Sequence, residues 1–178
     1  MYASARFSRL VFAFAALFSL LDLTAAAQTP PPPFTARNAV YLEGGGNALL
    51  YSMNYERMVI GGLSARVGVS LIPAWFPWVG EGDDGAALVM VPVQAGYVSG
   101  TGNHHLEIGA GATFGNASVD IGDLEGKESW VFGTGTVGYR FQRPEGGVVF
   151  RATVTPLFIE VLDVGVIPMI GLSLGRSF

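Results

Sequence analysis

The chain has 178 residues, of which half are hydrophobic, and it has no cysteine and a formal net charge of −4. The missing cysteines exclude disulfides, thiolate metal sites and a cysteine nucleophile, and the acidic balance gives no reason to expect nucleic-acid binding. Beyond the N-terminal segment, no apolar run approaches the ~18 residues that a membrane helix needs. The hydrophobicity is instead spread over many short segments, which fits membrane strands.

The N-terminal segment has the parts of a secretory signal. Arg6 and Arg9 precede a compact apolar core, and small residues follow it. We expect residues 1–27 to be a cleaved signal peptide that exports the chain. An uncleaved anchor helix is the alternative, although Asp22 interrupts a core that is already short for an anchor. Residues 28–37 contain consecutive prolines, which favour an extended chain, so they are predicted to form a periplasmic spacer.

From residue 38 onward the hydrophobic pattern has a period of two, which indicates strands. We predict strands at 38–45, 48–58, 63–72, 87–98, 104–115, 129–142, 147–158 and 166–178. Each has one apolar face and one face of small, polar or charged residues. A barrel domain over 38–178 follows, an all-β, eight-stranded antiparallel up-and-down transmembrane barrel with a filled polar interior. Pro92 falls within the fourth strand, where a proline removes a ladder hydrogen bond, so we expect a bulge or a different strand boundary there.

Charged residues on the less apolar strand faces are balanced in sign. Three acids and three bases can pair in a closed interior, and the apolar faces then meet lipid. The predicted interior charge cluster is Glu43, Glu56, Arg66, Glu107, Arg140 and Arg151. A conducting pore lined by these charges is the alternative, but eight strands leave an interior just wide enough for packed side chains.

The connections alternate in length, which places both termini of the chain in the periplasm. Residues 73–86, 116–128 and 159–165 are predicted to be long, acidic outer loops, whereas the first connection on that side is a tight turn. Outward aromatics near the periplasmic ends predict an interfacial girdle, made of Tyr55, Tyr97, Tyr139, Phe141 and Phe178. Arginines gather at the same rim, where they can reach lipid headgroups, namely Arg37, Arg57, Arg143 and Arg176. An apolar cluster in the first long loop is a candidate contact surface, formed by Trp75, Phe76 and Trp78.

These features resemble the small outer-membrane β-barrel proteins of the OmpX type and of the OmpA membrane domain. The resemblance rests on the export signal, the eight amphipathic strands and the final Arg176-Ser177-Phe178. It implies that Phe178, with apolar residues at alternate positions before it, is the signal for the barrel-assembly machinery, and Arg176 departs from that pattern. It implies little about function, because one barrel fold serves many roles.

The candidate chemistry is sparse. His104, His105 and Glu107 form the only histidine-containing cluster, which makes them weak catalytic candidates, and interior or turn residues are the simpler interpretation. Acidic loop stretches at 83–84 and 120–125 can attract Ca²⁺, but neither has the spacing of an EF-hand, so no metal site and no cofactor are predicted.

We therefore expect a monomeric, non-enzymatic protein of the bacterial outer membrane that presents acidic loops for envelope integrity or surface interaction. Its expected partners are outer-membrane lipid, lipopolysaccharide and, during biogenesis, the assembly machinery. The alternatives are a lipid-modifying enzyme similar to a lipid A deacylase, and a soluble periplasmic lipocalin-like barrel with an apolar interior.

Overall fold

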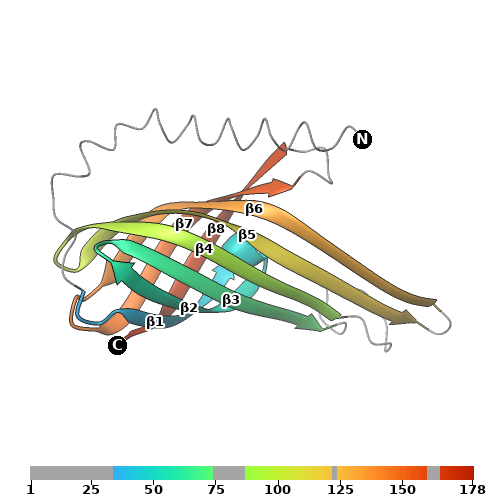
Figure 1. Cartoon of the computed structure of the whole chain (residues 1–178), viewed down its shortest axis with the longest axis horizontal. Helices are drawn as coiled ribbons and strands as arrows, with labels where there is room; N and C mark the ends of the chain where they lie inside the picture. The colour runs from blue at the N-terminus through green and yellow to red at the C-terminus, as the bar shows by residue number, and fades with distance from the viewer. Residues whose placement is uncertain (1–33, 74–86, 122–123, 160–164) are drawn as a thin grey trace. The chain divides into compact units, whose positions relative to one another are not determined.

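A computed structural model describes residues 34–73, 87–121, 124–159 and 165–178, all of which belong to one compact unit, residues 31–178 (Figure 1). The predicted signal segment and most of the predicted spacer lie outside these residues. The described chain forms a closed barrel of eight antiparallel strands, each paired with its neighbours in sequence, as predicted. The strands are β1 (Asn38–Gly45), β2 (Tyr51–Ile60), β3 (Leu63–Pro73), β4 (Ala87–Thr101), β5 (His104–Ile121), β6 (Leu124–Gln142), β7 (Gly147–Ile159) and β8 (Gly165–Ser177).

The barrel closes where β1 pairs with β8, from Ala39 opposite Ser177 to Gly45 opposite Gly171. Burial alternates along the strands with a period of two, as in β2, where every second residue is buried from Ser52 to Met58. This alternation is what the sequence pattern predicted, because successive side chains of a strand point to opposite faces.

The outer face is apolar. Val67, Phe150 and Leu172 have exposed fractions of 45%, 40% and 55%, so their side chains point away from the lumen. On β5, ten residue spacings separate His104 from Phe114. At ~3.3 Å per residue and a strand tilt of ~40°, they span about 25 Å along the barrel axis. That span equals the height of the apolar band on a membrane barrel. Among the described residues, no helix is long and apolar enough to cross a membrane.

The first connection folds into the barrel. It forms a short 3₁₀ helix, η2 (Gly46–Ala48), whose three residues are buried, and Figure 1 shows it inside the ring of strands. The Thr113 hydroxyl donates to the main-chain oxygen of Asn47 at 2.8 Å. Leu49 has a φ of +67°, and the Leu50 N–H donates to the Ala48 oxygen at 2.8 Å. The prediction that β2 begins at residue 48 was therefore wrong, because these residues turn inward instead.

Both mouths of the lumen are closed by apolar side chains. At the end that holds η2, Ala48, Ile72 and Met90 form a buried cluster. At the other end Phe34, from the predicted spacer, packs with Met58 and Val98. The lumen therefore has a polar middle between two apolar ends, and the ends were not predicted.

The end of the predicted spacer is attached to the barrel. The main-chain N–H groups of Thr35 and Ala36 both donate to the Pro144 oxygen, at 3.1 and 3.0 Å. The Met58 N–H donates to the Arg37 oxygen at 2.7 Å. These bonds hold the residues that flank Phe34 at the mouth.

The fifth connection differs from its prediction. Residues 116–128 were expected to form a loop, but β5 and β6 stay paired as far as Ile121 opposite Leu124. On one side β4 pairs with β5 as far as Ala87 opposite Ser118, and on the other side the pairing of β6 with β7 begins only at Gly133. The end of the β5–β6 hairpin therefore extends past both neighbouring strands (Figure 1).

The expected bulge at Pro92 is absent. Val67 pairs with Val93 and Ser70 with Met90, so the register of β3 against β4 is the same on both sides of the proline. The pairs between them are missing, because proline has no N–H to donate to β3. The register against β5 continues through Pro92 without interruption.

Candidate functional site

The six predicted interior charges meet in the middle of the lumen. They come from six strands, and all have side chains at most 4% exposed. Alternate residues of a strand share a face, so each strand brings its charge inward by the same period that turns its apolar residues outward. The members are Glu43, Glu56, Arg66, Glu107, Arg140 and Arg151.

These charges are joined by four ion pairs. Arg140 lies 2.8 Å from Glu56 and 3.5 Å from Glu107, measured from Nη1 to Oε2 in each case. The Nη2 of Arg151 lies 2.7 Å from Oε1 of Glu107, and Arg66 pairs with Glu43. Because three acids face three bases, the cluster has no net formal charge, which burial of so many ions requires.

Tyr41 lies at the centre of this cluster and was not predicted. Its hydroxyl donates to Oε2 of Glu56 at 3.1 Å. The guanidinium carbons of Arg66 and Arg151 lie 5.4 and 4.7 Å from its ring centroid, within the range of a cation–π interaction. Its position two residues before Glu43 places it on the inward face, and that spacing is the sequence signal that indicates it.

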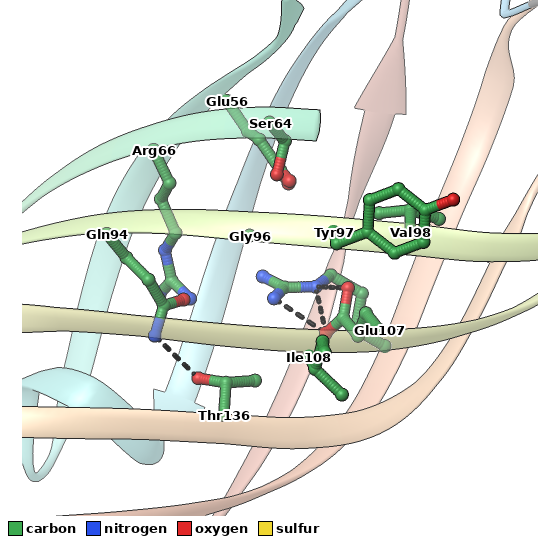
Figure 2. A pocket seen from close by; sticks show the side chains of 11 residues that line it. Glu56, Ser64, Arg66, Gln94, Gly96, Tyr97, Val98, Glu107, Ile108 and Thr136 are labelled. Atoms are coloured by element: carbon green, nitrogen blue, oxygen red, sulfur yellow. Dashed lines mark hydrogen bonds and ion pairs between the residues drawn. The ribbon is translucent and has the colours of Figure 1, made fainter. Parts of the chain in front are cut away.

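A small cavity adjoins the cluster (Figure 2). Its volume of about 10 Å³ leaves room for roughly one water molecule. Glu56, Arg66, Glu107 and Arg151 line it, together with Gln94, whose amide donates to the Thr136 hydroxyl at 2.8 Å. The surroundings are charged and hydrogen-bonded, and the space is too small for an organic substrate.

The weak catalytic candidates are not assembled into a site. His104 lies on the outer face, where its Nδ1 is 2.6 Å from the Tyr139 hydroxyl. His105 lies on the inner face, with its Nε2 at 3.1 Å from the main-chain oxygen of Gln142. Both carboxylate oxygens of Glu107 accept from Arg151, at 2.8 and 3.0 Å. The barrel wall therefore separates the two histidines, and the acid is committed to an ion pair.

The structure also places the other predicted residues that it describes. The girdle residues Tyr55, Tyr139 and Phe178 are exposed on the outer face, and the four rim arginines are exposed too. The contact cluster Trp75, Phe76 and Trp78 lies outside the described residues, as do the side chains of most acidic loop residues. In the part of the chain that the structure describes, no group of three or more His, Asp or Glu residues can hold a metal ion.

The fold is that of the small eight-stranded outer-membrane β-barrels, as the resemblance implied. The N-terminal β-barrel domain of Pseudomonas aeruginosa OprF matches with a TM-score of 0.55 and 19% identity, over 80% of this chain and 98% of that one. Neisserial surface protein A matches with a TM-score of 0.49 and 16% identity, over 79% and 92%. Ail of Yersinia pestis matches with 0.47 and 15%, also over 79% and 92%.

No protein-family model and no curated protein matches the sequence. At 19% identity, the likeness to the OprF domain shows the fold alone.

Proposed function

We propose that this chain is a non-enzymatic barrel of the bacterial outer membrane that displays its outer hairpins for surface interaction. One observation supports the membrane location above all others: the apolar side chains face outward while six paired charges fill the lumen. In water the outward face would be a large exposed apolar surface, which soluble proteins avoid. In a bilayer the same face is favourable, and the closed barrel leaves no unpaired strand edge within the hydrocarbon.

The same geometry argues against the alternatives. A lipocalin-like barrel needs an apolar lumen for its ligand, and here the middle of the lumen is ionic. A pore needs a water-filled path, and here Phe34 closes one mouth while η2 and its apolar neighbours close the other. An enzyme needs a nucleophile and base within reach of a substrate, and the histidines are on opposite sides of the wall.

The display role is supported by the β5–β6 hairpin. The outward Asn116 and Ser129 side chains share a hydrogen bond of 2.9 Å just beyond the exposed Phe114 and Val131, so polar contacts replace the apolar band at that height. Lys127 and Glu128, further out, are exposed. This paired hairpin carries exposed side chains beyond the apolar band, where a partner can reach them.

Cysteine labelling tests both the location and the orientation, because the natural sequence has no cysteine to interfere. We expect Lys127→Cys to react with a membrane-impermeant maleimide in intact cells. Glu145→Cys, in the exposed turn between β6 and β7, is the matched control and should react only after the outer membrane is permeabilised. The protein should also remain in membranes washed with carbonate. Release by carbonate, or labelling of Glu145→Cys alone in intact cells, would contradict the proposal.

A further inference from the structure

The outer face of β8, β1 and β2 carries a basic patch near the periplasmic end. In one row of paired residues Val40 lies between Arg176 of β8 and Tyr55 of β2. In the next row towards the rim, Asn38 lies opposite Arg57 and exchanges main-chain hydrogen bonds with Phe178, at 3.0 and 2.8 Å. The two arginines therefore lie diagonally across β1, with the short side chains of Asn38 and Val40 between them.

The two arginines have no acidic partner in the described chain. Neither Arg57 nor Arg176 has a carboxylate oxygen within 4.0 Å there, although all three lumen arginines do. Both are exposed on the outer face, where Arg176 has Val40 and Val148 as its cross-strand neighbours. A pair of unneutralised guanidinium groups beside an apolar surface favours a ligand that has both an anion and a hydrocarbon part.

The patch continues into an apolar path along β1. Val40 and Leu42 are outward, with exposed fractions of 39% and 62%, and nothing lies within 4 Å of where a side chain on the outward Gly44 would begin. From Asn38 through Val40 and Leu42 to Gly44, the path runs towards the middle of the predicted membrane. At its start, the Tyr55 hydroxyl donates to the Asn38 Oδ1 at 2.8 Å. The Asn38 NH₂ group donates one hydrogen to the Phe178 main-chain oxygen at 3.5 Å and has a second hydrogen to donate.

We propose that this patch is a binding site for one anionic glycerophospholipid of the periplasmic leaflet. Its phosphate lies between Arg57 and Arg176 and accepts from the Asn38 amide, and an acyl chain runs over Val40 and Leu42 beside β8 and β2. The proposal rests on the proposed membrane location. Free phosphate shares the headgroup chemistry, but it cannot use the apolar path, so the site selects the lipid.

Native mass spectrometry of the refolded barrel in detergent micelles tests the site. The probes are phosphatidylglycerol and phosphatidylcholine with identical acyl chains, each added at equal concentration, and inorganic phosphate alone. Each basic residue near a lipid surface contributes about fivefold to anionic-lipid affinity. We therefore expect wild type to retain phosphatidylglycerol at least tenfold better than phosphatidylcholine, and not to retain inorganic phosphate.

A double variant and a matched control locate the site. Arg57→Gln with Arg176→Gln should lower phosphatidylglycerol retention to the level of phosphatidylcholine. Arg143→Gln removes an exposed arginine from the same rim, in the turn after β6 and outside the patch, and should keep a clear preference for phosphatidylglycerol over phosphatidylcholine. Equal retention of the two lipids by wild type overturns the proposal, and so does an equal loss in the double variant and in Arg143→Gln. Retention of inorganic phosphate alone also overturns it.

Failure of the lipid site can be distinguished from failure of the proposed function. Each variant is first checked for the shift between boiled and unboiled protein on a gel, which reports a folded barrel. A folded barrel that stays in carbonate-washed membranes but shows no lipid preference removes only the lipid site. A chain released by carbonate removes the membrane location itself.

Discussion

Replacing Arg140 with methionine tests whether the lumen charges stabilise the barrel as one paired unit. Arg140 is fully buried, and its Nη1 donates to both carboxylate oxygens of Glu56, at 2.9 and 2.8 Å. Its Nε donates to the Gln142 side-chain oxygen at 2.8 Å. Methionine retains much of the volume and removes every one of these bonds, so Glu56 loses its only ion-pair partner in the described chain.

The magnitude follows from the burial. Removing one partner of a buried ion pair costs about 3–5 kcal/mol, because an uncompensated charge stays behind. The Tyr41 hydroxyl still donates to Glu56, but this bond to an ionised group is worth only about 1.5–3 kcal/mol. We therefore expect Arg140→Met to lower the free energy of unfolding by about 3 kcal/mol or more.

A second change shows whether the cost comes from the orphaned carboxylate. Arg140→Met combined with Glu56→Met removes both charges and keeps the lumen neutral, because Arg151 and Arg66 retain Glu107 and Glu43. Replacing a whole buried pair by apolar groups is often neutral. The double variant should therefore be more stable than the single variant by about 2 kcal/mol.

The assay is urea unfolding of the barrel in phospholipid vesicles, followed by tryptophan fluorescence and by gel mobility of unboiled samples. Arg143→Met, at an exposed turn position, is the control and should stay within about 0.5 kcal/mol of wild type. If Arg140→Met costs less than about 1 kcal/mol, or if the double variant is less stable than the single one, the lumen charges do not act as a buried pair and the reasoning fails.

Three further predictions concern the wall and the histidines. Val137→Arg places a charge midway up the outer face, where Val137 is 61% exposed, and it should lower stability in vesicles by about 2–4 kcal/mol; no loss would contradict a lipid-facing position. Gly111→Ala brings its Cβ to 2.0 Å from a main-chain oxygen of β4, whereas at Gly44 nothing lies within 4 Å. In urea unfolding, Gly111→Ala should therefore cost about 1–3 kcal/mol or more, because it overpacks the wall. Gly44→Ala should cost almost nothing. Equal effects of the two substitutions would refute the clash. Replacing His104 and His105 together by alanine should leave lipid A unchanged by mass spectrometry, and a changed acylation pattern would restore the enzyme hypothesis.

The sequence was sufficient to predict the strands and their faces because both depend on one local property. A period of two assigns each side chain to a face, whichever strands are neighbours. Glu56 and Arg140 could thus be assigned to the lumen without knowing the register. That they touch each other could not be predicted, since they are 84 positions apart and their meeting depends on how the strands stagger around the closed barrel.

The features that were not predicted, the apolar mouths and the inward first turn, lie at the ends of the strands. There local packing decides the structure, and a periodic pattern does not encode it. Met58, Ile72 and Met90 are apolar and point inward, and they belong to the two mouth clusters. Gly45 and Gly46 have φ values of +71° and +66°, which let the chain turn into the lumen. A glycine pair predicts a turn, but it does not tell whether the turn points outward or inward.

The two apolar mouths and the ionic middle explain each other. Charges buried in pairs are stable only where their partners and hydrogen bonds are fixed, and access of bulk water would weaken each attraction by raising the local dielectric. The clusters of Phe34 at one end and of Ala48 at the other limit the access of bulk water, so the arginines and glutamates must neutralise one another. The apolar outer face has the reverse requirement, because it is stable only where water is absent outside. A barrel that satisfies both conditions is closed at its ends and surrounded by hydrocarbon around its middle. The lumen charges and the apolar outer wall together therefore favour a membrane barrel over a soluble lipocalin-like one.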